Sequence, residues 1–126
     1  MEDDKFYEFL ELYRNPEHYG KPGKFSQSES CYSPSCGDRF VVYLELEDGR
    51  VKNASFEGSG CVISTVATSK LCSYLIGRSL SDVKEMNLDS IKKLLGVTEL
   101  SISRVKCATV SLEAVKKMAL KVEGSD

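Results

Sequence analysis

The sequence has neither a surplus of basic residues nor a long apolar run. Its 17 Lys and Arg residues are balanced by 19 Asp and Glu residues, which gives a net charge of -2 and a pI near 5.5. This balance gives no electrostatic reason to expect binding to nucleic acid or to an anionic membrane. No apolar run approaches the roughly 20 residues that are needed to span a bilayer.

The N-terminus also lacks the apolar core of a secretion signal, because Met1-Glu2-Asp3-Asp4-Lys5 is acidic. We therefore expect a cytoplasmic protein. Histidine is nearly absent as well. His18 is the only one and lies in a polar stretch that ends at Gly23, so we expect a loop residue there rather than a metal ligand.

Five cysteines are present, which is an odd number. In a reducing compartment they are better interpreted as free thiols or ligands than as a disulfide framework. They are Cys31, Cys36, Cys61, Cys72 and Cys107.

The length of 126 residues predicts one domain over residues 1–126, with residues 1–4 and 122–126 flexible at its ends. Apolar spacings of three and four predict a helix over residues 4–14, which Pro16 ends. The period-two pattern of Phe40, Val42, Leu44 and Leu46 within residues 39–47 predicts a half-buried strand. Asp48-Gly49 predicts a hairpin to a return strand over residues 50–57. Part of residues 21–35 could pair with this hairpin as an edge strand.

Helical patterns dominate the second half of the chain. A helix is expected from Cys61 to about Ile76, followed by two short helices and an extended connector over residues 97–106. A last helix is expected to begin at Cys107. Ser79 or Ser81 can cap the first short helix and Asn87 the second. The expected fold class is α+β, a small three-stranded antiparallel sheet with helices packed on it.

Three cysteines and one aspartate fall at the ends of these elements. Cys36 and Asp38 flank Gly37 in a turn just before the first strand of the hairpin, while Cys61 and Cys107 are each expected to begin a helix. A helix N-terminus has unpaired N–H groups that favour a thiolate. If these residues converge, three sulfurs and one oxygen would suit Zn²⁺ or an iron–sulfur cluster rather than Ca²⁺ or Mg²⁺.

The two remaining cysteines fit such a site less well. Cys72 lies eleven residues after Cys61 in the same expected helix, roughly 16 Å along its axis, so one ion cannot bind both. We interpret Cys72 as a buried structural thiol. Cys31 lies near enough to Cys36 to approach the site, but a strand or surface position is the simpler expectation.

Four motifs occur in a characteristic order, and together they resemble the IscU/NifU-N/SufU family of iron–sulfur cluster scaffolds over about residues 6–120. They are Tyr13-Arg14-Asn15-Pro16, Ser35-Cys36-Gly37-Asp38, Phe56-Glu57-Gly58-Ser59-Gly60-Cys61 and Arg104-Val105-Lys106-Cys107-Ala108. The resemblance implies a non-enzymatic scaffold or carrier. It would accept sulfur from a cysteine desulfurase and pass a transient cluster to apo-proteins.

The resemblance also implies the roles of individual residues. Cys36, Cys61 and Cys107 would be cluster or zinc ligands, and Asp38 would be the labile ligand that keeps the cluster transferable. Cys107 or Cys36 would be the persulfide acceptor. One subunit could hold a [2Fe–2S] cluster, and a homodimer could share a [4Fe–4S] cluster.

The sequence departs from the family pattern in ways that affect its expected branch. Lys106 stands where IscU-type members have a histidine, which is more like the SufU type. Residues 100–106 stand where IscU-type members have a Leu-Pro-Pro-Val-Lys segment that a dedicated chaperone binds. The longer insertion that SufU-type members have between the central helix and the arm before Cys107 is absent. Cys31 or Lys106 could contribute at the site in compensation.

Three hypotheses follow from the sequence. The first is a cluster scaffold, and the second is a zinc-dependent carrier of persulfide sulfur of the SufU type. The third is a fixed zinc site that only stabilises the fold. Asp38 argues against the third, because closed structural zinc sites prefer Cys and His ligands.

Overall fold

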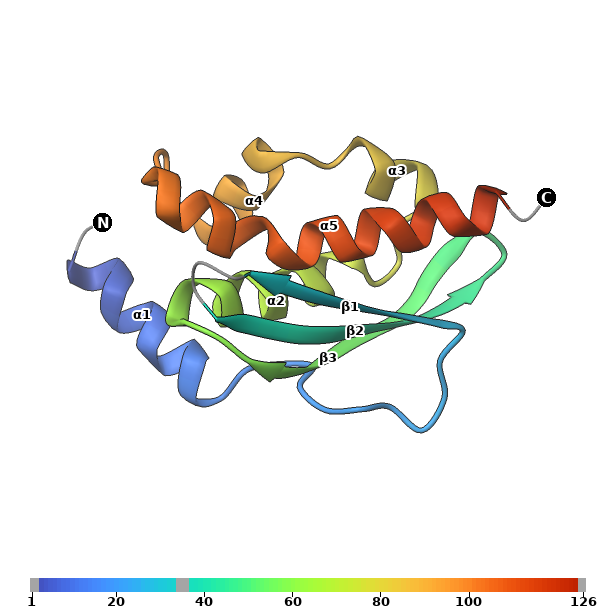
Figure 1. Ribbon diagram of the computed structural model, residues 1–126, viewed down its shortest axis with the longest axis horizontal. Helices are drawn as coiled ribbons and strands as arrows, with labels where there is room; N and C mark the ends of the chain where they lie inside the picture. Colours follow the sequence, from blue (N-terminus) through green and yellow to red (C-terminus); the bar gives the residue numbers. More distant parts are fainter. Residues whose placement is uncertain (1–2, 34–36, 125–126) are drawn as a thin grey trace.

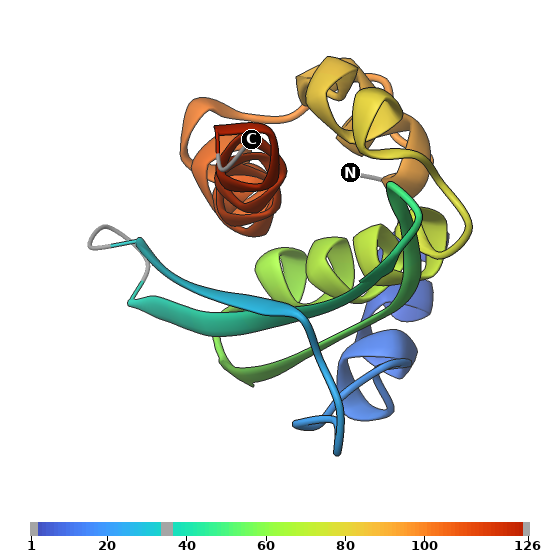
Figure 2. The same ribbon diagram turned by 90° about the vertical axis from the view of Figure 1, so that its right-hand side faces the viewer.

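A computed structural model of the chain describes residues 3–33 and 37–124. Its elements, in chain order, are α1 (Asp3–Arg14), β1 (Gln27–Ser33), β2 (Asp38–Glu47), β3 (Arg50–Ser59), α2 (Val62–Leu75), α3 (Leu80–Glu85), α4 (Leu88–Leu95) and α5 (Ile102–Gly124). Helices α2 and α5 cover one face of the sheet, and α3 and α4 pack beyond them (Figures 1 and 2). The expected α+β class is confirmed.

The sheet is antiparallel with the order β1-β2-β3, so the edge strand that the sequence left open is β1. Asp48 and Gly49 both have positive φ angles, 54° and 76°, as a tight two-residue hairpin turn requires. The pairing of β2 with β3 shifts between Glu45 and Leu46. This bulge explains why Val51 is buried together with Ala54, although alternation would place them on opposite faces.

The core lies between the sheet and its helices. Phe40, Val42 and Leu44 point inward from β2, as their alternation predicts, and Phe56 does so from β3. Against them packs α2, which is buried on nearly all sides rather than along a single stripe. Its polar residues Ser64, Thr65, Thr68 and Ser69 are therefore buried as well. Burial on nearly all sides explains why many residues of α2 have small side chains, such as Ser, Thr and Ala.

Local capping signals were correct for the two short helices. The Ser79 side chain accepts a hydrogen bond from the Asp82 backbone N–H at the start of α3, and Asn87 forms a reciprocal capping box with Ser90 at the start of α4. Gly96 ends α4 in the left-handed conformation.

The expected start of the last helix was wrong. Helix α5 begins at Ile102 instead of Cys107, and the Val105 N–H already donates to the Ser101 carbonyl at 2.9 Å. The Arg104 N–H donates to the Ser101 hydroxyl at 3.4 Å. Half of the expected extended connector is therefore helical, and Cys107 lies in the second turn of α5.

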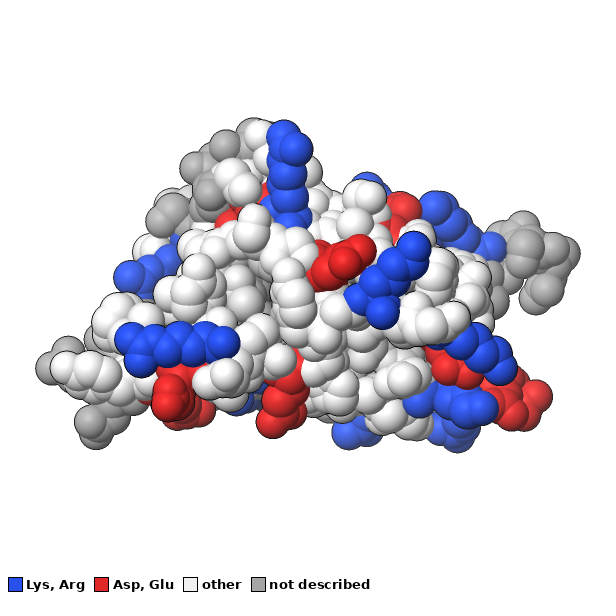
Figure 3. Space-filling model, turned by 90° about the horizontal axis from the view of Figure 1, so that it is seen from below, with Lys and Arg blue, Asp and Glu red and all other residues white. Residues whose placement is uncertain are grey.

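The face of the molecule seen from below carries no region of a single charge (Figure 3). Basic and acidic side chains are interspersed there, in line with the near-zero net charge. In residues 3–33 and 37–124, no helix is long and apolar enough to cross a membrane.

Candidate metal and cluster site

Three of the four expected ligands come together in the structure. A carboxylate oxygen of Asp38 and the Sγ atoms of Cys61 and Cys107 all lie within 4.8 Å of one another. Asp38 is the first residue of β2, Cys61 is the N-cap of α2, and Cys107 lies in α5. Two thiols and a carboxylate are donors that suit Zn²⁺ or iron.

Cys36, the fourth expected ligand, lies outside the described residues. The turn that follows it is described from Gly37, whose φ is +71°, a conformation that glycine adopts without strain. The Gly37 N–H donates to the Ser33 carbonyl at 2.8 Å. Ser33 pairs with Asp38 across the β1–β2 ladder, so this turn directly precedes the first ligand of the site.

Asp38 is fully buried and its two carboxylate oxygens differ. Oδ1 accepts hydrogen bonds from the Cys61 N–H at 2.9 Å and from the Ser64 hydroxyl at 3.0 Å. Oδ2 has no hydrogen-bond partner among the described residues. A buried carboxylate oxygen without a partner is costly, and a cation bound beside it would offset that cost. The site therefore fits a metal ion or a cluster.

Cys61 holds its place by capping α2, as the sequence predicts. Its Sγ accepts a hydrogen bond from the Ser64 N–H at 3.4 Å, and its side chain is partly exposed. An N–H group that points at a sulfur suits a sulfur that carries negative charge. Cys61 Sγ thus accepts a hydrogen bond from a backbone N–H and can also be reached from solvent.

Cys107 reaches the site by a different route from the one expected. It does not begin a helix, so the argument from a helix N-terminus does not apply to it. It is 5% exposed and projects from the second turn of α5, which packs on α2 and on the sheet. Tertiary packing of α5 therefore positions this thiol.

Two glycines, Gly58 and Gly60, let the chain pass close to the start of β2. A Cβ atom on Gly60 would lie 2.5 Å from both Asp38 Oδ1 and Ser64 Oγ. A Cβ atom on Gly58, where φ is +128°, would lie 2.1 Å from the Arg39 carbonyl oxygen. The Gly-Ser-Gly run before Cys61 is thus required by space as well as by turn geometry.

Among the described residues, the group of Asp38, Cys61 and Cys107 does not include Cys31 or Cys72. Cys72 is completely buried, and burial raises the pKa of its thiol to about 12. Cys31 is half-buried on β1, where its Sγ lies 3.6 Å from the Phe40 carbonyl and 3.9 Å from Ser111 Oγ. Burial raises the pKa of Cys31 too, despite the opposing hydrogen bond to Ser111.

Two polar candidates remain, Lys106 and His18. The Lys106 side chain is exposed and lines a pocket of about 480 Å³ with Tyr32, Ser33 and Glu113. His18 lies in the loop after α1, as expected, and its φ angle is 65°. Among the described residues, His18 does not belong to the group that could hold a metal.

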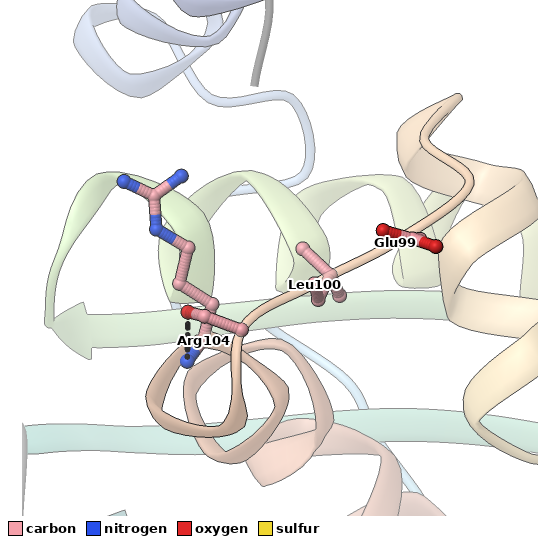
Figure 4. Close-up of a pocket in the computed structure, with 4 residues that line it drawn as sticks. Glu99, Leu100 and Arg104 are labelled. Atoms are coloured by element: carbon pink, nitrogen blue, oxygen red, sulfur yellow. Dashed lines mark hydrogen bonds between the residues drawn. The ribbon is translucent and has the colours of Figure 1, made fainter.

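A separate pocket of about 300 Å³ lies where the connector enters α5 (Figure 4). Glu99, Leu100, Ser101 and Arg104 line it. Figure 4 shows the Arg104 guanidinium pointing away from Glu99, with the Leu100 side chain between them. This segment is partly helical where an extended arm was expected, because α5 begins at Ile102.

Sequence reasoning missed Ser64. This side chain is fully buried and contacts both Asp38 and Cys61. A signal was present, because Ser64 is the third residue after the Cys61 N-cap. The side chain at that position commonly reaches back to the cap in a capping box.

Comparison with known proteins agrees with the fold. Residues 5–124 match the family described as NifU-like N terminal domain. The chain is 29% identical to the zinc-dependent sulfurtransferase SufU of Bacillus subtilis (strain 168), over 93% of this chain and 90% of that protein. It is 34% identical to the iron–sulfur cluster assembly scaffold protein IscU of Thermotoga maritima, over 70% of this chain and 72% of that protein.

Solved structures share the fold at lower identity. The N-terminal part of a nitrogen-fixing NifU-like protein from Brucella abortus superposes with a TM-score of 0.79 at 18% identity, covering 98% of each chain. A structure described as a putative iron–sulfur cluster assembly scaffold protein for the SUF system, from Fervidobacterium islandicum AW-1, gives a TM-score of 0.70 at 20% identity. That alignment covers 86% of this chain and 91% of the other.

Proposed function

The chain belongs to the family of NifU-like N-terminal domains, and from this premise we propose that it is a scaffold for iron–sulfur cluster assembly. It receives sulfur from a cysteine desulfurase, holds a transient cluster as its cargo and passes the cluster to apo-proteins. In this role it is a carrier rather than an enzyme that turns over a small molecule. A relative named as an IscU scaffold, 34% identical, supports this function.

The observation that carries the proposal is the convergence of Asp38, Cys61 and Cys107 within 4.8 Å. They come from a strand, a helix cap and a helix interior, so the folded chain brings them together before any cargo is bound. Cys36 is proposed as the fourth ligand, from its place two residues before Asp38. One chain would then present three thiolates and one carboxylate to a [2Fe–2S] cluster, whereas a [4Fe–4S] cluster could be shared in a homodimer.

The mixed ligand set suits a cargo that has to leave. Thiolates bind iron tightly, while a carboxylate is a harder and weaker partner for iron in a sulfur-rich cluster. Asp38 therefore provides the position at which an acceptor's ligand can displace the scaffold.

Sulfur would enter by exchange between a persulfide and a thiolate. The attacking thiolate bonds to the outer sulfur of the desulfurase persulfide, the persulfide S–S bond breaks, and the desulfurase cysteine leaves as a thiolate. An electron donor then reduces the transferred sulfur to sulfide for the cluster. Cys107 or Cys36 is proposed as the acceptor. Because Cys107 is buried, docking of the desulfurase has to open a path to it.

A zinc-dependent carrier of persulfide sulfur is the second candidate function. The SufU relative, named a zinc-dependent sulfurtransferase, matches nearly the whole chain at 29% identity. Lys106, which replaces the histidine of the IscU type, points the same way. The same four residues would hold Zn²⁺, and the product would be sulfane sulfur on a cysteine instead of a cluster.

Anaerobic reconstitution separates the two functions. The metal-free protein is incubated with ferrous iron and sulfide, desalted and analysed for iron, acid-labile sulfide and visible absorption. A scaffold should retain iron and sulfide in equal amounts and pass them to an apo-ferredoxin. A zinc-dependent carrier should retain zinc in preference and accept one sulfane sulfur from a desulfurase.

Matched cysteine variants assign the site. Cys61→Ser should abolish cluster or zinc binding, while Cys31→Ser and Cys72→Ser should leave binding nearly intact because neither sulfur lies in the three-residue group. Retention of a full cluster by Cys61→Ser would refute the proposed site. Loss of binding in Cys31→Ser would show that the chain recruits a further thiol.

A further inference from the structure

Ser64 touches two of the proposed ligands at once. Its hydroxyl lies 3.0 Å from Asp38 Oδ1, 3.1 Å from the Cys61 carbonyl oxygen and 3.5 Å from Cys61 Sγ. Its backbone N–H donates to the same sulfur at 3.4 Å. Ser64 is itself fully buried, in the first turn of α2.

We propose that Ser64 is a positioning residue, which holds the Asp38 carboxylate so that Oδ2 alone faces the metal or cluster. The proposal rests on the proposed function, because it assigns to Ser64 a role in the same ligand set. Between the carboxylate and the carbonyl as acceptors, the hydroxyl proton goes preferentially to the charged carboxylate.

The division of labour between the two carboxylate oxygens supports this role. Oδ1 has two donors, the Cys61 N–H and the Ser64 hydroxyl, and they leave it little capacity to bind a metal as well. Oδ2 is equally buried and has no hydrogen-bond partner among the described residues. The carboxylate is therefore presented through one oxygen. Without the hydroxyl, one N–H would remain, and a single hydrogen bond leaves the carboxylate free to rotate.

Ser64 is itself fixed by its surroundings. A side chain at Gly60 would collide with both Ser64 and Asp38, so this glycine provides the space in which the two meet. One turn further along α2, the Thr68 hydroxyl donates to the Ser64 carbonyl at 2.7 Å and lies 2.6 Å from Ser111 Oγ on α5. Thr68 links α2 to α5 and, within the part of the chain that the structure describes, makes no hydrogen bond to Asp38, which makes it the matched control.

The test uses Co²⁺ alone as the probe, because Co²⁺ occupies sulfur and oxygen sites and absorbs visible light. Co²⁺ affinity and the absorption spectrum are measured for wild type, Ser64→Ala, Asp38→Ala and the double variant. We expect Ser64→Ala to lower Co²⁺ affinity about tenfold and to change the ligand-field bands, as loss of a group that orients a ligand does. Thr68→Val should lower thermal stability but keep the wild-type affinity and spectrum.

The double variant decides whether Ser64 acts through Asp38. If it does, Ser64→Ala should have little further effect once Asp38 is replaced, because there is no carboxylate left to orient. Additive losses in the double variant, or a wild-type spectrum in Ser64→Ala, would overturn the proposal. Failure of the wild type to bind Co²⁺ through its thiols would refute the ligand set itself, which distinguishes that outcome from a failure of Ser64 alone.

Discussion

Asp38 combines full burial with one carboxylate oxygen that has no hydrogen-bond partner in residues 3–33 and 37–124. A carboxylate held only for the sake of the fold would be expected to have both oxygens hydrogen-bonded. The two thiols beside it are the stronger ligands for iron, so the aspartate is the weakest link of the proposed set. At the scale of a single residue, the proposed site is thus suited to reversible binding of its cargo.

Replacement of Asp38 by alanine should leave the fold intact and slow cluster transfer. The easiest point of attack for an acceptor is removed, so a reconstituted cluster should persist longer and its transfer to an apo-acceptor should slow by about tenfold, a typical effect of altering groups at a metal site. The measurement is the half-life of the cluster, followed by visible absorption with and without the acceptor.

The same variant separates transfer from simple stability. If the site only holds a structural zinc ion, Asp38→Ala would weaken metal binding and lower the melting temperature. The apo-acceptor would then have no specific effect on the rate of metal loss. Faster loss of the cluster from a well-folded variant would count against the labile-ligand role.

Cys72 gives a prediction about pH because burial raises the pKa of its thiol from the ordinary 9.0 to about 12. At a pH between these two pKa values, the Cys72 thiol is deprotonated in the unfolded chain and protonated in the folded chain. The unfolded state therefore binds fewer protons. Stability that is fully present below pH 9 is therefore lost as the pH rises toward 12. The expected loss from this group is about 1.4 kcal/mol between about pH 8 and about pH 10.

Urea denaturation of the metal-free protein at the two pH values measures this loss. Cys72→Ala serves as the control, since every other titrating group is retained. The variant should be less stable at neutral pH because of the cavity, but should lose less stability on going to alkaline pH. An equal loss in both proteins would show that Cys72 does not titrate as a buried thiol.

At the scale of elements, local sequence patterns correctly predicted turns, strand faces and helix caps. The Asp48-Gly49 turn, the inward alternation of Phe40 and Val42 and the Asn87 cap were all correct, because each depends on neighbours within a few residues. The face of α1 was not predictable in this way. Six apolar side chains surround that helix, yet packing against α2 fully buries Phe9 and leaves Tyr7 69% exposed.

The beginning of α5 shows how tertiary packing overrides a local pattern. Residues 102–106 contain two β-branched side chains, Ile102 and Val105, which favour an extended backbone. In the fold, the same residues continue a long helix that packs on the sheet and on α2. The sequence therefore predicted the helix but placed its first residue too late.

Proline substitutions test the revised start of α5. Val105→Pro should destabilise the protein by about 3 kcal/mol, because it removes the hydrogen bond to the Ser101 carbonyl and clashes with the preceding turn. Ile102→Pro, at the first helical residue and 84% exposed, should change stability by no more than about 0.5 kcal/mol. Chemical denaturation measures both. Equal tolerance of the two prolines would favour the extended connector.

At the scale of the whole molecule, the sequence predicted which three of the described residues converge better than it predicted the means by which they meet. Cys61 was placed correctly at a helix start, whereas Cys107 was expected at a helix start and lies inside one. Motif order carries the first kind of information. The second depends on how α5 packs against α2, which no local pattern specifies.

Because the three ligands come from β2, α2 and α5, metal binding should stabilise the entire fold. An ion that binds only the folded chain adds about 2.7 kcal/mol at a free concentration one hundred times its Kd, which for a domain of this size raises Tm by roughly 10 °C. Calorimetry of chelator-treated and Zn²⁺-loaded protein measures the shift. Cys31→Ser should keep the shift, since its sulfur lies outside the three-residue group, while Cys61→Ser should lose most of it. An undiminished shift in Cys61→Ser would mean that zinc stabilises the chain from another place, and the junction of β2, α2 and α5 could then not be its binding site.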